Sequence, residues 1–249
     1  MNEISNQKKI KIGTYIDRCN FISDVFIQYY LNFFTHDEFH FFILDKNYDD
    51  VYSYLKSKNF NDSSFESVSN NHIGVHTLMD KQNSFVRELT SNGIIVVYVD
   101  IDEILYHIDL RNFILENNSN YIVPKGVVLI PNIDDEELNK INKVLDQRSY
   151  CVLDDVYHSK VTVLRENYIW SAGRHNKNNT PISDEIFLID ISKCCPQIMI
   201  ENNIMSNNLY SSSTERYSIT DIEKIHKILN EWRTRITILP KKITDSKLF

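Results

Sequence analysis

The stretch Gly93-Ile94-Ile95-Val96-Val97-Tyr98-Val99-Asp100-Ile101-Asp102-Glu103 decides how the rest of the chain is interpreted. Its first seven residues form the most apolar run of the sequence, and β-branched side chains dominate that run. A short run of this kind is typical of a strand that is buried on both faces. We therefore predict that it lies in the middle of a parallel sheet.

Two carboxylates, Asp100 and Asp102, follow this strand one residue apart. Open α/β sheets bind their ligands at the carboxyl ends of their strands, and side chains at i and i+2 of an extended chain share a face. Two neighbouring carboxylates repel each other unless a cation lies between them or one is protonated. Their hard oxygen atoms favour Mg²⁺ or Mn²⁺, ions that commonly accompany phosphate-bearing substrates. We predict a metal site here; the alternative is a solvated acidic turn.

The segments before this strand alternate between strand and helix patterns. Period-2 or continuous apolar runs predict strands, and apolar residues at helical spacing predict helices. The expected strands are Lys9–Tyr15, His40–Asp45, Phe65–Val68 and Gly93–Val99, and the expected helices begin at a Ser23 cap, at an Asp49 cap and at Ser84. A β-α-β-α-β-α-β order is typical of a doubly wound sheet with right-handed crossovers.

The second half of the sequence is less regular. We predict helices at Ile108–Leu115, at Asp134–Gln147 and after a Thr220–Glu223 capping box, strands at Val127–Ile130 and Ile186–Ile191, a turn at Pro124-Lys125-Gly126, and a strand pair formed by Lys160–Leu164 and Tyr168–Ser171. The polar stretch Asn202–Thr214 is expected to be a loop, which either closes over a bound ligand or is an ordinary surface loop. No internal repeat and no interdomain linker is evident, so we expect a single domain.

Composition narrows the class of protein. A length of 249 residues suits one α/β domain, and a net charge of −7 argues against a nucleic-acid-binding protein. The four cysteines include no C-x-x-C pair, which favours a reducing compartment over a disulfide framework or a zinc site. No apolar run approaches the roughly 20 residues that span a bilayer. We therefore expect a cytoplasmic protein without a transmembrane segment.

Several of these pieces together resemble glycosyltransferases of the GT-A fold, in the family-2-like group whose metal motif reads D-x-D-E followed by an apolar residue. The resemblance covers most of the chain in order. The matching pieces are Ile12-Gly13-Thr14, Phe41–Asp45, Lys81-Gln82-Asn83, Val99–Ile104, Ser159-Lys160 and Gly173-Arg174-His175-Asn176. It implies a mostly parallel central sheet with helices on both faces, a nucleotide-binding half at about 9–104 and an acceptor half at about 105–249.

The resemblance also implies an activity: transfer of a sugar from a nucleotide-diphosphate sugar, with a UDP-sugar as the first choice, to a hydroxyl of a glycan or other acceptor. Inversion at the sugar carbon and a role in surface polysaccharide synthesis are expected. The implied donor-binding residues are Thr14, Asp17, Asp45, Gln82, Asp100 and Lys160, and the implied ligands of Mn²⁺ or Mg²⁺ are Asp100, Asp102 and His175. A cation would act as the Lewis acid for the diphosphate leaving group.

Inversion also needs a general base near the acceptor hydroxyl. The candidate carboxylates are Glu103, Asp154, Asp155, Asp184 and Glu185. We favour Asp184 and Glu185 because they follow the G-x-H segment and its loop. The chain departs from the group in the next strand, where Asp190 stands in a stretch that commonly carries a histidine, so Asp190 is a possible substitute metal ligand or else the metal site is incomplete.

Two other classes of protein stay open. A haloacid-dehalogenase-like phosphatase also places two aspartates, here Asp100 and Asp102, after an apolar parallel strand. However, Ile104 stands where that family has Thr or Val, and Asp154-Asp155 is the only other feature in its favour. The second class is a nucleotide-sugar-binding relative without activity. Hydrolysis of p-nitrophenyl phosphate would identify the phosphatase. Nucleotide binding without donor turnover would identify the inactive relative.

Overall fold

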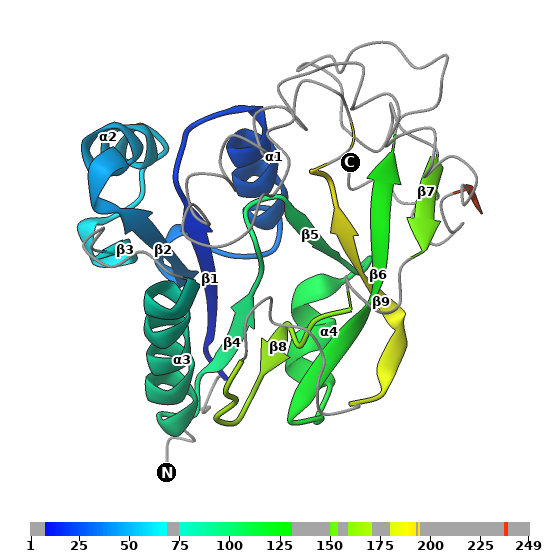
Figure 1. The fold of residues 1–249 in the computed structure, drawn as a ribbon. Helices are drawn as coiled ribbons and strands as arrows, with labels where there is room; N and C mark the ends of the chain where they lie inside the picture. The colour runs from blue at the N-terminus through cyan, green and yellow to red at the C-terminus, as the bar shows by residue number, and fades with distance from the viewer. Residues whose placement is uncertain are drawn as a thin grey trace.

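A ten-stranded sheet connects the described parts of the chain (Figure 1). The computed structural model describes residues 8–68, 75–130, 150–153, 159–170, 180–192, 194 and 237–238. The strands are β1 (Ile10–Ile16), β2 (Phe39–Leu44), β3 (Phe65–Val68), β4 (Ile95–Tyr98), β5 (Glu103–Tyr106), β6 (Tyr121–Ile130), β7 (Tyr150–Leu153), β8 (Val163–Leu164), β9 (Ile182–Asp190) and β10 (Thr237–Ile238). The α-helices are α1 (Phe21–Tyr30), α2 (Tyr48–Ser57), α3 (Val75–Ser91) and α4 (Leu110–Glu116), and the short 3₁₀ helices are η1 (His36–Glu38), η2 (Asp45–Asn47) and η3 (Asp62–Ser64).

The first four strands are parallel and lie in the order β3-β2-β1-β4. This arrangement confirms the predicted α/β class and the alternation of strands and helices in the first hundred residues. Because parallel strands point the same way, the carboxyl ends of β1, β2 and β4 meet at one edge of the sheet. Backbone bonding continues past the last paired residues, since Val99 N donates to Gly13 O at 3.2 Å.

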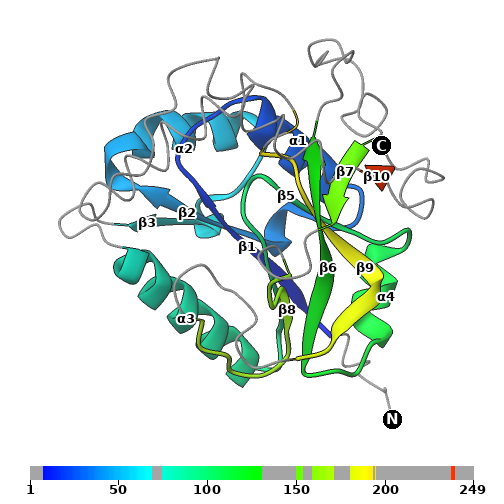
Figure 2. The same ribbon diagram turned by 45° about the vertical axis from the view of Figure 1, so that its right-hand side comes forward.

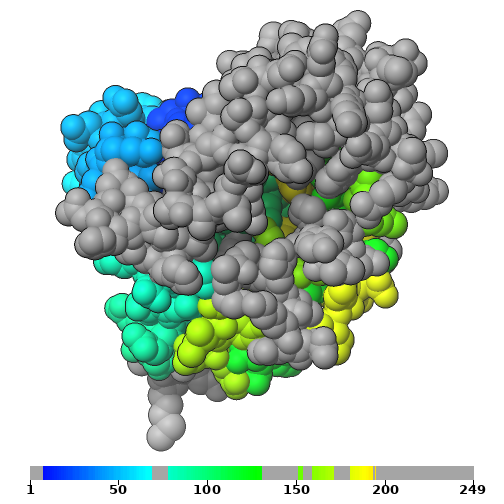
Figure 3. Space-filling view, viewed as in Figure 1, coloured from blue at the N-terminus to red at the C-terminus, as the bar shows by residue number. Residues whose placement is uncertain are grey.

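The two faces of this parallel part carry separate apolar cores. In β4, Ile95 and Val97 face a core that includes side chains of α1, α2 and α4, whereas Val96 and Tyr98 face a second core with α3. Each buried aliphatic side chain contributes about 1.5–3 kcal/mol relative to an exposed position. Helices therefore cover both faces, as predicted (Figure 2), and α3 reaches the surface on the face shown in Figure 3.

The remaining strands make the sheet mixed. β8 is antiparallel to β4 and β6, β7 to β6 and β10, and β5 to β9, whereas β9 is parallel to β6. The predicted turn at Pro124-Lys125-Gly126 is wrong, because these residues lie inside β6. The register with β9 shifts between Pro124 and Lys125, and such an irregularity accommodates a proline, which has no N–H to donate.

Two further local predictions are corrected. Val163–Leu164 pairs with β4 and β6, and the described part of the predicted partner strand, Tyr168–Trp170, is not a strand. Helix α1 begins before the expected cap: Asn20 Oδ1 accepts a bond from Ser23 N at 3.2 Å, so Asn20 is the N-cap and Ser23 lies inside the helix. The helix predicted at Asp134–Gln147, the Asn202–Thr214 loop and the helix after Thr220 lie outside the described residues.

Candidate functional site

The acidic turn after β4 is closed by reciprocal hydrogen bonds. Glu103 N donates to Asp100 O at 3.0 Å, and Asp100 N donates to Glu103 Oε2 at 2.9 Å. Glu103 is only 2 % exposed, so its carboxylate is fixed below the turn rather than directed to solvent. The predicted strand end is confirmed, and the turn leads into β5 rather than into a helix.

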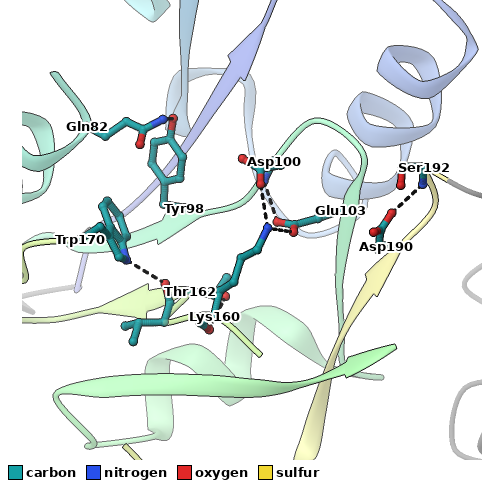
Figure 4. A network of polar contacts seen from close by, with 10 residues as sticks. Gln82, Tyr98, Asp100, Glu103, Lys160, Thr162, Trp170, Asp190 and Ser192 are labelled. Carbon is teal, nitrogen blue, oxygen red and sulfur yellow. Dashed lines mark hydrogen bonds and ion pairs between the residues drawn. The ribbon is translucent and has the colours of Figure 1, made fainter. Parts of the chain in front are cut away.

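A lysine lies between two carboxylates of this turn (Figure 4). Lys160 Nζ is 2.9 Å from Asp100 Oδ2 and also bonds Glu103 Oε1. The segment that carries the lysine is fixed between strands, since Tyr98 N donates to Thr162 O at 2.8 Å and Thr162 N donates to Ile122 O at 3.1 Å. Lys160, predicted as a donor-binding residue, thus joins Asp100 in one cluster.

Asp190 brings a further carboxylate to the same place. The pairing of β5 with β9 sets Glu103 opposite Asp190, and Ile191 N donates to Asp102 O at 2.9 Å. Asp190 is buried and accepts a bond from Ser192 N at 2.7 Å. Burial, followed by the negative charges of Asp190 and then Asp100, raises the pKa of Asp102 to about 8.

The donor chemistry of this cluster fits a hard divalent cation. Asp102 and Asp190 are carboxylates that disfavour each other's ionisation, and a cation would relieve that repulsion. Among the described residues, however, no three His, Cys, Asp or Glu side chains are grouped as a metal site. Asp100 is paired with Lys160, and His175 lies outside the described residues. The predicted trio of Asp100, Asp102 and His175 therefore stays a prediction, and the structure places the further carboxylate Asp190 near Asp102.

Other predicted residues gather at the carboxyl end of β1. Thr14 and Asp17 are buried there, and burial raises the pKa of Asp17 while Arg18 at 3.5 Å opposes the shift. Gln82, on α3, donates to the Tyr98 hydroxyl at 2.7 Å. Because Gly13 of β1 pairs with Tyr98 of β4, these groups and the acidic turn lie at the same edge of the sheet.

Tyr15 belongs to this group, although the sequence analysis did not identify it. Its side chain is 5 % exposed, and within the described structure neither its hydroxyl nor that of Thr14 has a hydrogen-bond partner. The pKa of Tyr15 is raised first by burial and then by the nearby Asp17 and Tyr98. A buried hydroxyl without a partner is costly and uncommon, which marks this strand end as a place where a ligand group can bind. A polar aromatic residue directly before the strand-end loop was the available signal.

Asp45 lies at the end of the neighbouring strand β2. Its side chain is exposed and hydrogen-bonded to Ser67 Oγ. The residue is thus on the ligand-binding edge of the sheet, as expected, but it is not part of the buried groups around β1.

Asp184 and Glu185, the predicted general bases, lie elsewhere. Both are exposed near the beginning of β9, and the side chain of Asp184 is 88 % exposed and 3.8 Å from Lys125 Nζ. Asp190 is at the other end of this strand. At roughly 3.3 Å per residue, the two ends are on the order of 15–20 Å apart. The structure does not bring this pair to the cluster, and their catalytic role stays a prediction.

The fold is an α/β sheet with charged side chains at the carboxyl ends of adjacent parallel strands, the edge at which open α/β sheets bind their ligands. No protein-family model matches the sequence, and no curated protein matches it. Among solved structures, the chain is similar to a Bacillus anthracis protein described as a glucose-1-phosphate thymidylyltransferase, with 11% identity, 89% and 83% coverage of the two chains and a TM-score of 0.35.

Two further similar structures are larger proteins. Staphylococcus aureus TarS has 11% identity and a TM-score of 0.38, and the alignment covers 96% of this chain and 44% of TarS. The bifunctional glycosyltransferase WbbM has 11% identity and a TM-score of 0.28, with 95% and 46% coverage. The chain thus spans less than half the length of either protein. Within the described residues, no helix is long and apolar enough to cross a membrane.

Proposed function

We propose that this chain is a glycosyltransferase that moves a sugar from a nucleotide-diphosphate sugar, with a UDP-sugar as the first choice, to a hydroxyl of a glycan or other acceptor. The observation that carries the proposal is the cluster of Asp100, Asp102, Glu103, Lys160 and Asp190, which lies beside buried polar groups at the end of β1. One region of the sheet edge thereby offers charge for a diphosphate, and the other offers hydrogen bonds for a nucleoside.

The two regions would have different roles. The Tyr15 hydroxyl and the Asp17 carboxyl lie where a nucleoside could accept and donate hydrogen bonds. Asp45 would contact the ribose or base from the neighbouring strand end. Lys160 would place a positive charge near the diphosphate, held in position by Glu103.

Charge balance supports a cation requirement. The cluster holds the carboxyl groups of Asp100, Asp102, Glu103 and Asp190 against one ammonium, so a cation should strengthen the binding of an anionic diphosphate. When bound, Mn²⁺ or Mg²⁺ would neutralise charge that develops on the leaving diphosphate, and Asp102 and Asp190 would hold the ion. The protein contributes the fixed turn, the ordered lysine and the low exposure of Asp190.

The experiment is a thermal-shift screen of UDP, GDP, CDP and dTDP with and without Mn²⁺, followed by a donor-hydrolysis and transfer assay with the matching nucleotide sugars. At a ligand concentration 100-fold above Kd, binding stabilises the folded state by about 2.7 kcal/mol, which is easily measured. Asp102→Asn should abolish the Mn²⁺-dependent shift and turnover without unfolding the protein. The exposed Asp49→Asn change is the matched control and should alter neither.

The same assays separate the alternative functions. Full activity in Asp102→Asn would refute the assignment of the cluster. Hydrolysis of p-nitrophenyl phosphate would instead identify a phosphatase that uses Asp100 and Asp102. A nucleotide-induced shift without any donor turnover would identify a binding protein.

A further inference from the structure

Lys160 and the turn that it contacts form one fixed unit (Figure 4). The lysine side chain is 13% exposed, and it bonds both Asp100 Oδ2 and Glu103 Oε1. Glu103 uses its other oxygen to accept the Asp100 backbone N–H. An ammonium held by two carboxylates, one of them buried, is unlike a solvated lysine that is free to move away.

This arrangement has a consequence for metal binding at the proposed site. Asp100 is the carboxylate nearest in sequence to Asp102, yet its Oδ2 atom is paired with an ammonium at 2.9 Å. In the described structure, the Lys160 ammonium occupies one of the two Asp100 carboxylate oxygens. A divalent cation that is held by Asp102 and Asp190 and also recruits Asp100 must therefore displace the ammonium or bind close to it. Positive charges at such distances repel each other.

We propose that Lys160 competes with a divalent cation for Asp100, so that the lysine weakens cation binding to the unliganded protein while it strengthens binding of a nucleoside diphosphate. The proposal rests on the glycosyltransferase function proposed above. It predicts opposite effects of one substitution: loss of the lysine charge should tighten Mn²⁺ binding and weaken UDP binding. A lysine that serves only to stabilise the fold would not separate the two ligands in this way.

The test is Lys160→Met, with Mn²⁺ affinity measured by electron paramagnetic resonance and UDP affinity measured by calorimetry without added metal. Removing a unit charge about 5 Å from a divalent ion should tighten Mn²⁺ binding by at least about tenfold, even at the dielectric constant of water. UDP binding should weaken by a similar factor. Lys160→Arg keeps the charge and should leave Mn²⁺ affinity within about threefold of the wild type.

Lys125→Met is the matched control, because it removes a lysine that pairs with the exposed Asp184 on β9. Its Mn²⁺ affinity should stay close to that of the wild type. Should Lys160→Met fail to fold because Glu103 is left buried and unpaired, Lys160→Gln keeps hydrogen bonding without the charge.

Mn²⁺ affinity in the folded Lys160 variant that is equal to or weaker than in Lys125→Met would overturn the proposal. Absence of measurable Mn²⁺ binding in both the wild type and the variant would overturn it as well. If neither the wild type nor any variant transfers sugar, only the proposed glycosyltransferase function is contradicted. The Mn²⁺ titration contains no nucleotide-sugar donor, so its result does not depend on sugar transfer.

Discussion

Removal of the buried Tyr30 hydroxyl, which bonds strand β5, should lower the unfolding free energy of the protein. One edge of β5 pairs with β9, and two tyrosines of α1 bond its other edge. Tyr30 OH accepts from Leu105 N at 2.7 Å and lies 3.4 Å from Glu103 O, to which it donates. Tyr29 OH donates to Leu105 O at 2.8 Å. The hydroxyls thus take the place of a neighbouring strand.

Tyr30→Phe keeps the ring and removes the hydrogen bonds of the Tyr30 hydroxyl with Leu105 N and Glu103 O, whereas the Tyr29 bond remains. Tyr30 is 0% exposed, so water does not replace the hydroxyl, and the Leu105 N–H is left without its acceptor. A buried donor without a partner costs about 1–3 kcal/mol, and the longer bond to Glu103 adds little. For a chain of this length we expect a fall in Tm of about 2–10 °C. Urea unfolding followed by circular dichroism measures the free energy directly.

Tyr52→Phe is the control, because the Tyr52 hydroxyl bonds Asp62 at the surface, at 3.0 Å, and should cost less than about 0.5 kcal/mol. Equal unfolding free energies for Tyr30→Phe and Tyr52→Phe would refute the reasoning. They would mean that the Leu105 N–H finds another partner or that β5 does not need this support.

Three further changes test other parts of the structure. The pKa of Asp102 is raised to about 8 in the folded protein, so proton binding to this group stabilises the fold fully below about pH 4, and this stabilisation is lost as pH rises to 8. The unfolding free energy of Asp102→Asn, measured by urea titration, should therefore rise relative to that of the wild type from pH 5 to pH 8. An equal difference between the two proteins at both pH values would contradict the raised pKa. Gly13→Ala would place Cβ 2.7 Å from Tyr98 Cδ2 and should cost about 1–3 kcal/mol in urea unfolding, whereas a neutral effect would show that the ring moves freely. Arg111→Lys loses a two-pronged contact with Glu38, at 2.8 and 2.9 Å, and should lower the unfolding free energy by about 1 kcal/mol, with no change indicating a solvated pair.

Local pattern predicted the parallel half of the fold because its evidence lies within single segments. The apolar run at β4 forms a strand buried on both faces and ends at the acidic residues, as expected. The prediction that it lies in the middle of a parallel sheet is wrong on one side, because β4 pairs with the parallel β1 and with the antiparallel β8. The turn predicted at Pro124 was wrong because a contact with a strand far away in the sequence decides the structure there. Proline and glycine usually mark turns, but pairing with β9 at a register shift outweighed that local preference.

The candidate site was only partly predictable because its contacts cross large sequence separations. Asp100 and Lys160 are 60 residues apart, and nothing near either residue indicates their ion pair. Asp190 reaches Asp102 only through the register of β5 with β9, which local pattern does not determine. Asp184 and Glu185 were favoured by their position in the sequence, whereas the direction of β9 places them at the far end of the strand.

Contacts at both ends of helix α1 require it to keep its present length. Asn20 caps its beginning, beside the loop that carries Asp17, and Tyr29 and Tyr30 bond β5 at its end. One extra residue within the helix would turn the tyrosines by about 100° and shift them by about 1.5 Å, so that they could no longer reach the strand. Insertions should therefore be tolerated in the exposed segment after Asn117 but rejected within α1. A scan of single-residue insertions across both segments, scored by the yield of folded protein, would reveal this fixed length.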